Sequence, residues 1–218
     1  MASINITITG NIASGKTTLT QLASQHVANA CHVPEPYKTN PFLPLYLQDQ
    51  RRWGFTSTLH YCWGYAHEYA EVVANTPCHY AFIDTGTWTN RLVYAEYLYR
   101  EQFITADEFA FYGVLCDVIE KAYRYPTPDG FVFVNASPQT CWERMHRRGW
   151  TYQTTTIQRA YIETLHHYFE VMKQVVASRN IPILEIDSEA LNFIQPEGQQ
   201  GALRRLEGFL QRYQRPDP

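Results

Sequence analysis

Residues 3–17 have the sequence SINITITGNIASGKT, and this stretch decides the fold. Its first seven residues alternate β-branched with polar side chains, which predicts a β-strand. Residues 10–17 fit the pattern G-x-x-x-x-G-K-[ST], and apolar residues at helical spacing follow from Leu19 to Ala30. A glycine loop between a strand and a helix is the setting in which this pattern binds phosphate. The sequence therefore predicts a nucleotide-binding loop.

The residues of this loop have separate expected roles. Its glycines let the backbone fold tightly, so that N–H groups and the helix N-terminus point at phosphate oxygens. Lys16 is expected to bridge the β- and γ-phosphates of ATP or GTP, and Thr17 to offer its hydroxyl to Mg²⁺. The expected nucleotide-binding residues of the loop are Gly10, Asn11, Ala13, Ser14, Gly15, Lys16, Thr17 and Thr18.

Further along the chain, short apolar runs alternate with segments of helical spacing. This alternation predicts an α/β fold with a parallel sheet covered on both faces. Strands are predicted at 3–9, 32–33, 80–84, 131–134 and 181–186, and helices at 15–30, 49–75, 88–100, 106–124, 138–148, 155–179 and 199–213. Prolines cluster in three places, interpreted as a loop (34–44), a helix-to-strand connection (126–128) and a frayed end (216–218). No linker divides residues 1–218, so a single domain is expected.

Composition narrows the class of protein. Apolar residues make up 45% of the 218 positions and the net charge is −3, which excludes a disordered chain and argues against nucleic-acid binding. No run of eighteen apolar residues and no signal-peptide pattern occurs, so we expect a cytoplasmic protein without a membrane span. Aromatic residues reach 15%, which suggests aromatic packing or a pocket for a flat ligand.

The five cysteines are widely spaced and odd in number, and none forms a C-x-x-C pair. This spacing argues against a metal site and against disulfides, and it favours reduced thiols.

Two acidic residues follow predicted strands. Glu35 lies in the segment VPEP at the carboxyl edge of the sheet, where it can accept a proton from a substrate hydroxyl. Taken alone, this segment favours a solvated loop glutamate. Asp84 ends a buried strand, the usual place of a Mg²⁺-associated carboxylate, and it can also cap the helix that follows.

Residues 143–149, with the sequence ERMHRRG, contain three arginines. Arg144 and Arg148 share one helix face at a spacing of four residues. A mobile arginine segment can close over phosphates, whereas a solvated basic helix end explains the same pattern without any function.

Four segments in this order resemble the deoxynucleoside kinases, P-loop enzymes that phosphorylate the 5′-hydroxyl of deoxyribonucleosides in nucleoside salvage. They are GNIASGKTTL (10–19), VPEP (33–36), RRWGFT (51–56) and SPQTCWERMHRRG (137–149). The resemblance implies a five-stranded parallel sheet flanked by helices, an arginine-containing LID at about 144–154, and a homodimer formed through a helix bundle.

The resemblance also implies roles for single residues. Glu35 matches the general base, and Asp84 matches an acidic residue near the metal. Arg144 and Arg148 match LID arginines that contact the phosphates and adenine of ATP. Trp53 and Phe55 match aromatic positions that lead into the nucleoside pocket.

Most nucleoside-side positions depart from the family pattern. Thr85 replaces the arginine that holds the 5′-oxygen, and Thr58 replaces the glutamine that hydrogen-bonds the base. Leu47, with Tyr46 beside it, replaces a sugar-contacting tyrosine, and Asn90 replaces an aspartate that helps select the base. Two LID positions also differ: Trp150 replaces the third arginine, and Gln153 or a neighbour replaces a glutamate.

These departures favour an altered or broadened substrate, because lost polar partners widen the pocket. Alternatively, Tyr46, Tyr65, Asn90 or Arg91 has taken over the lost contacts. The function predicted is ATP-dependent transfer of a γ-phosphoryl group to the 5′-hydroxyl of a deoxynucleoside or modified nucleoside. Two rivals stay open: a kinase for another hydroxyl acceptor (nucleic acid, nucleotide or natural product), and a nucleotide-binding regulator without activity.

Overall fold

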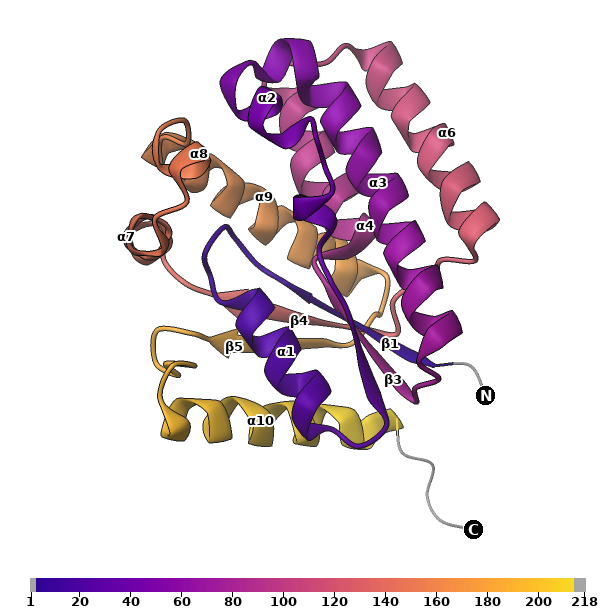
Figure 1. Ribbon diagram of the computed structural model, residues 1–218, viewed down its shortest axis with the longest axis vertical. Helices are drawn as coiled ribbons and strands as arrows, with labels where there is room; N and C mark the ends of the chain where they lie inside the picture. The colour runs from indigo at the N-terminus through magenta and orange to yellow at the C-terminus, as the bar shows by residue number, and fades with distance from the viewer. Residues whose placement is uncertain (1–2, 214–218) are drawn as a thin grey trace.

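The computed structural model describes residues 3–213, which fold around one parallel sheet (Figure 1). The strand order is β2-β3-β1-β4-β5, and every neighbouring pair runs parallel. The strands are β1 (Ile4–Thr9), β2 (Ala30–Val33), β3 (Tyr80–Asp84), β4 (Gly130–Asn135) and β5 (Ile183–Asp187). The predicted α/β class and the predicted parallel sheet are confirmed.

Helices connect these strands and cover both faces of the sheet. They are α1 (Lys16–His26), α2 (Leu43–Gln48), α3 (Gln50–Asn75), α4 (Gly86–Thr89), a π-helical turn (Asn90–Ala95), α5 (Glu96–Arg100), α6 (Ala106–Tyr123), α7 (Pro138–Arg148), α8 (Thr151–Thr154), α9 (Arg159–Ser178) and α10 (Pro196–Leu210). Short 3₁₀ turns occupy Pro36–Lys38 and Gln211–Tyr213.

Two layers of apolar packing hold the helices on the sheet. On one face, α1 and α10 bury their apolar side chains against Ile6, Ile8 and Val132. On the other face, α9 and the π-helical turn pack against Phe131 and Phe133. Figure 1 shows α10 and α1 below the sheet and α3, α4 and α9 above it. Because both faces are covered, β3 and β4 carry near-continuous apolar runs, whereas β1 alternates isoleucine with polar residues that are nevertheless buried.

Capping residues explain where several helices begin. Asp49 precedes α3 and accepts a hydrogen bond from the backbone N–H of Arg52 at 2.9 Å. Thr105 and Glu108 form a reciprocal capping box at the start of α6. Ser137 caps α7, whose end at Gly149 has φ +71°, a conformation that suits glycine. These signals place the helix ends within a few residues of the predicted boundaries.

The proline-rich segment 34–44 is less irregular than expected, because Pro44 lies in the first turn of α2, where proline is well tolerated. The helix predicted at 88–100 is divided by the π-helical turn. The predicted frayed end at 216–218 lies outside the described residues. Among residues 3–213, no helix has both the length and the apolar character needed to cross a membrane.

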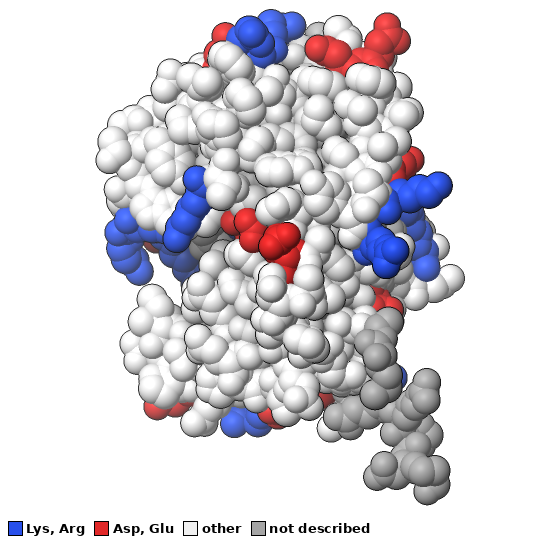
Figure 2. Space-filling model, turned by 45° about the vertical axis from the view of Figure 1, so that its right-hand side comes forward, with Lys and Arg blue, Asp and Glu red and all other residues white. Residues whose placement is uncertain are grey.

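Helix α6 has an outer face that is unusually apolar for a surface helix. Phe111, Val114 and Val118 follow one another at helical spacing and are 55%, 57% and 60% exposed. Figure 2 turns the side of α6 toward the viewer, and much of the surface in this view carries neither blue nor red side chains.

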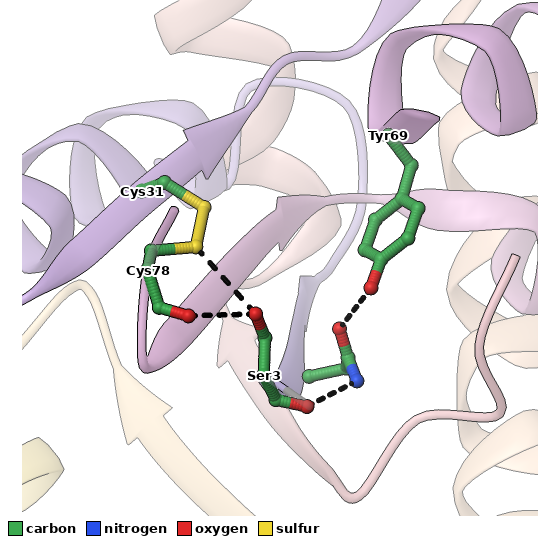
Figure 3. Close-up of a disulfide and its surroundings, with 5 residues drawn as sticks. Ser3, Cys31, Tyr69 and Cys78 are labelled. Atoms are coloured by element: carbon green, nitrogen blue, oxygen red, sulfur yellow. Dashed lines mark hydrogen bonds between the residues drawn. A yellow bond between two sulfur atoms is a disulfide. The ribbon is translucent and has the colours of Figure 1, made fainter. Parts of the chain in front are cut away.

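The expectation of free thiols is wrong for two of the five cysteines. Cys31 in β2 and Cys78, just before β3, form a disulfide, with their Cα atoms 5.7 Å apart (Figure 3). The two residues are 47 positions apart, and only the pairing of β2 with β3 brings them together. Cysteine spacing alone therefore gave no sign of the bond. Cys62, Cys116 and Cys141 are free and buried.

Candidate active site

The carboxyl edge of the sheet gathers the predicted catalytic groups. β1 leads into the phosphate-binding loop, β2 leads into Glu35, and β3 ends at Asp84. Because these three strands are parallel neighbours, their ends meet at one edge, where α/β proteins bind ligands.

The phosphate-binding loop is tightly built. A Cβ atom on Gly10 would lie 2.4 Å from the carbonyl oxygen of Val134, so only glycine fits there. Gly15 has φ +105° at the start of α1, a conformation that side chains strongly disfavour. Asn11 donates from Nδ2 to the carbonyl of Ile162 at 2.9 Å, which ties the loop to α9. Lys16 is buried at the end of this loop.

A donor cleft lies beside this loop. The expected residues Ala13, Gly15, Lys16, Thr17, Thr18, Arg144 and Arg148 line it. The cleft also contains residues that the sequence analysis missed, most of them from the connection between β5 and α10: Arg147, Ser188, Glu189, Asn192, Phe193 and Ile194. No pattern in that connection pointed to a nucleotide.

The two predicted LID arginines differ in their contacts. Arg144 donates to the carbonyl of Ser14 at 3.1 Å and to the hydroxyl and carbonyl of Ser188 at 2.8 and 2.7 Å. Arg148 is exposed and lies 3.8 Å above the ring of Trp150, and it also donates to the amide oxygen of Gln153. Arg144 is thus fixed in place, whereas Arg148 belongs to the outer segment.

Trp150 links this outer segment to the Glu35 loop. Its ring stacks on Tyr37 with 5.2 Å between centroids and lies 6.0 Å from the ring of Tyr152. Trp150 stands where the family has an arginine, and its contact with Tyr37 closes this side of the site.

An acceptor cavity lies next to the donor cleft. Glu35, Tyr46, Leu47, Thr58, Tyr65 and Asn90, all predicted to contact the substrate, line its wall. The other lining residues are Ile12, Tyr37, Leu43, Ser57, Tyr61, Tyr94, Tyr152, Gln153, Ile157 and Tyr161. The high aromatic content of the sequence was the only sign of this tyrosine-rich wall. Tyr161 in particular fits the apolar stripe of its helix as well as it fits a pocket.

Glu35 has the electrostatics of a general base. Burial raises its pKa to about 7, Lys16 and Arg148 act to lower it, and the carboxylate of Asp84 raises it further. A carboxylate with a pKa near neutrality is well matched to proton abstraction from a hydroxyl.

Asp84 is buried beside the phosphate-binding loop. Burial raises its pKa, while Lys16 and a hydrogen bond from the Thr17 side chain act in the opposite direction. The Thr17 hydroxyl and the Asp84 carboxylate are oxygen donors in contact, which is the donor set that Mg²⁺ prefers. Within residues 3–213, no cluster of three or more His, Cys, Asp or Glu side chains forms a metal site by itself.

Thr85 has a strained backbone at the centre of the site. Its φ of +75° and ψ of −65° are rare for a β-branched residue. Its N–H donates to the carbonyl of Ile8 at 2.9 Å, and its carbonyl accepts from the Thr89 hydroxyl at 2.6 Å. The Thr85 hydroxyl lies 3.4 Å from Oδ1 of Asp84 and also hydrogen-bonds Glu35. Its single hydrogen can be donated to one carboxylate at a time, either Asp84 or Glu35.

Four residues predicted to contact the substrate are absent from the cavity lining, and one of them, Asp84, lies beside the phosphate-binding loop instead. Arg91 points to α6 and pairs with Asp117 at 2.8 Å and Glu120 at 3.5 Å, so it does not replace the missing arginine. Trp53 and Phe55 pack against the apolar cluster that includes Tyr46 and Tyr97. Helical spacing alone could not show which way these side chains turn.

Comparison with known proteins agrees with this geometry. The family model described as Deoxynucleoside kinase matches residues 6–207. A probable deoxycytidine kinase of fowlpox virus is 24% identical over 201 residues, which cover 91% of this chain and 84% of the relative. A mitochondrial deoxyguanosine kinase of Xenopus laevis is 25% identical over 215 residues, covering 84% of this chain and 81% of the relative.

A solved structure of deoxyadenosine kinase from M. mycoides, with dCMP and a flexible dCDP bound, has a similar fold. Its TM-score is 0.75 at 17% identity, and the match covers 94% of this chain and 99% of the other. The predicted resemblance and the predicted kinase class are confirmed: the chain belongs to the deoxynucleoside kinase family.

Proposed function

We propose that this protein transfers the γ-phosphoryl group of ATP to the 5′-hydroxyl of a deoxynucleoside. One observation carries the proposal: Glu35 lines the acceptor cavity, Lys16 lines the donor cleft, and the two are close enough for Lys16 to lower the pKa of Glu35. A base for the acceptor hydroxyl and a cation for the phosphates thus lie at the boundary between the two sites.

Each group has a defined part in the transfer. Glu35 accepts the proton of the 5′-hydroxyl as its oxygen attacks the γ-phosphorus. Lys16 and Arg148 stabilise negative charge on the transferring phosphoryl group. Arg144 holds the loop around Ser188 against the phosphate-binding loop and so shapes the donor cleft.

The site also fits Mg²⁺, because the Thr17 hydroxyl and the Asp84 carboxylate lie together beside Lys16. These two residues would hold the ion, either directly or through water. When bound, Mg²⁺ neutralises charge on the phosphates of ATP.

The acceptor cavity suits a flat, weakly polar ligand. Seven tyrosines line it, and Glu35 is the one carboxylate among its lining residues. A nucleoside base fits such walls through ring contacts. Thr58 replaces the family's base-binding glutamine, and Thr85 replaces the arginine that holds the 5′-oxygen. A modified or larger nucleoside is therefore included in the proposal.

We also propose that the enzyme is a homodimer. The exposed stripe of Phe111, Val114 and Val118 on α6 supports a self-contact, because a second copy of α6 would cover it. Light scattering should give twice the monomer mass for the wild type, and V114E should reduce it to the monomer mass. A monomeric wild type would overturn this proposal. Independently of the dimer, we also propose a cytoplasmic location, a single domain over residues 1–218 and a LID at about 144–154.

The decisive experiment is a transfer screen with ATP labelled in the γ-phosphate. The acceptors are the four deoxynucleosides, the ribonucleosides, base-modified nucleosides and short DNA, with K16A as the inactive control. Transfer to a deoxynucleoside supports the proposal. Transfer only to another hydroxyl compound favours a different kinase, and ATP binding without any transfer favours a regulator.

A further inference from the structure

Arg148 is a cation that lies near both sites. It lines the donor cleft, and its charge acts to lower the pKa of Glu35, which lines the acceptor cavity. Among residues 3–213, no carboxylate forms an ion pair with its guanidinium group. A long side chain of this kind samples many rotamers unless other contacts restrict it. Those contacts therefore decide where the charge of Arg148 lies.

Trp150 provides the closest of these contacts. The guanidinium carbon of Arg148 lies 3.8 Å from the centroid of the Trp150 ring, well within the range of a cation–π interaction. Gly149, between the two residues, ends α7 with φ +71°, and this left-handed turn lets side chains two positions apart face each other. The amide oxygen of Gln153 accepts a hydrogen bond from the same guanidinium group. Arg148 is thus held by an aromatic face and one neutral amide.

The Trp150 ring also joins Arg148 to the acceptor cavity. It stacks on Tyr37, with 5.2 Å between centroids and 25° between planes, and on Tyr152, with 6.0 Å and 23°. Both tyrosines line the acceptor cavity, and Tyr37 follows Glu35 by two residues. Trp150 itself lines neither the cavity nor the donor cleft. Its contacts therefore connect a residue of one site to residues of the other.

We propose that Trp150 is a positioning residue, which holds the Arg148 guanidinium group in place for phosphoryl transfer and ties it to the loop that carries Glu35. Trp150 acts through Arg148 and Tyr37 and touches neither substrate. An aromatic ring suits this place, because its face attracts a cation, whereas a second cation would repel Arg148. This inference rests on the proposed function, because it assumes that Arg148 stabilises the transferring phosphoryl group.

Loss of the ring should reduce turnover more than it reduces ATP binding. W150L removes both the cation–π contact and the stack on Tyr37, so kcat should fall roughly 10-fold. The KM for ATP should change by less than about 3-fold, because the phosphate-binding loop and Lys16 stay in place. W150F keeps an aromatic face and should retain kcat to within about 3-fold of the wild type. Steady-state kinetics with ATP and each of the four deoxynucleosides measure these values.

A double-mutant cycle tests whether Trp150 acts through Arg148. R148A alone should lower kcat by roughly 10²-fold, the usual cost of removing one group that stabilises the transition-state charge. Adding W150L to R148A should lower kcat by less than about 3-fold more, because no guanidinium group remains to be positioned. W142L is the matched control, since Trp142 of α7 packs on His146 and lines neither site. It should keep kcat to within about 3-fold in either background.

The outcomes separate the inference from the proposed function. An active wild type whose kcat is unchanged in W150L overturns the inference while the kinase activity stands. The same follows if W150F is as impaired as W150L, or if the roughly 10-fold loss from W150L persists in the R148A background. No transfer by the wild type to any deoxynucleoside, with ATP still bound, overturns the proposed function itself.

A second pair of variants decides if circular dichroism melts show that W150L does not fold. Y37L removes the stack on Trp150 from the other partner and should lower kcat, whereas Y37F keeps the ring and should retain it. Equal kcat values in Y37L and the wild type would overturn the inference.

Discussion

The guanidinium group of Arg144 holds Ser188 at two points: Nη1 donates to the hydroxyl at 2.8 Å, and Nη2 donates to the carbonyl at 2.7 Å. Nη1 also reaches the carbonyl of Ser14 in the phosphate-binding loop at 3.1 Å. One side chain of α7 therefore connects the loop after β5 to the loop after β1. Arg144 therefore fixes the two sides of the donor cleft relative to each other.

Replacing Arg144 should weaken nucleotide binding. R144K keeps the positive charge but loses the planar fork that reaches three acceptors at once. Hydrogen bonds from charged groups contribute about 1.5–3 kcal/mol, so we expect the KM for ATP to rise roughly 10- to 100-fold. S188A removes only the hydroxyl contact and should have a smaller effect. Steady-state kinetics at varied ATP measure both, and equal effects would contradict the bridging role.

Removing the carboxylate of Glu35 should separate chemistry from binding. E35Q retains the size of the side chain but cannot accept the proton, so kcat should fall by about 10²–10⁴-fold. Binding of ATP, measured by calorimetry, should change little, because Glu35 lines the acceptor cavity and not the donor cleft. An equal loss of kcat and of ATP binding would show that Glu35 maintains the structure instead.

The activity should depend on pH through the same group. The pKa of Glu35 is raised to about 7 by burial, with Lys16, Arg148 and Asp84 as the charged groups around it. Since the base acts as a carboxylate, kcat/KM for the nucleoside should rise with pH, with a midpoint near 7, and fall about tenfold per pH unit below it. A flat profile between pH 5.5 and 8.5 would contradict this assignment.

Stability gives an independent test of the Glu35 pKa. A carboxyl group with a pKa raised in the folded state binds more protons when folded, so the wild type loses stability as pH rises from about 4.5 to about 7. E35Q does not titrate, so its melting temperature relative to the wild type should increase between pH 5 and pH 8. Over the whole pH range, the free energy of unfolding of the wild type should fall by up to about 3 kcal/mol relative to that of E35Q. If the melting-temperature difference between E35Q and the wild type stays the same from pH 5 to pH 8, the pKa of Glu35 is not raised.

The hydroxyl of Thr85 should help set the pH profile. It hydrogen-bonds the Glu35 carboxylate, and such a bond lowers the pKa of the group that accepts it. T85V keeps the volume and the branching but loses the hydroxyl, so the rising limb should move to higher pH and activity at pH 7 should fall roughly five-fold. T85S keeps the hydroxyl and should keep the wild-type midpoint. A T85V profile that matches the wild type would exclude this contact.

The sequence predicts the fold where local chemistry dictates it. The strand at residues 3–9 and the loop after it carry their own pattern, and buried runs such as the one ending at Asp84 mark the remaining strands. Because parallel strands meet at one edge, the positions of Lys16, Glu35 and Asp84 follow directly. These positions can be predicted without knowing which way any side chain points.

The other parts of the site depend on tertiary contacts, which the spacing of residues along the sequence does not predict. Arg91 lies in the π-helical turn and pairs with Asp117 of α6, and no local pattern predicted either the turn or this contact. Tyr61 and Tyr94 come from separate helices and converge only in the folded chain. The bond between Cys31 and Cys78 likewise exists because two strands pair.

That disulfide encloses a particular part of the chain. Residues 31–78 include Glu35, Tyr46, Thr58 and Tyr65, and hence much of the acceptor cavity. A protease that cuts once after the exposed Lys38 would leave both fragments covalently joined. The nicked protein would migrate as one band on a gel without reductant and as two bands after reduction, so the segment that carries the proposed catalytic base is retained even when its backbone is broken.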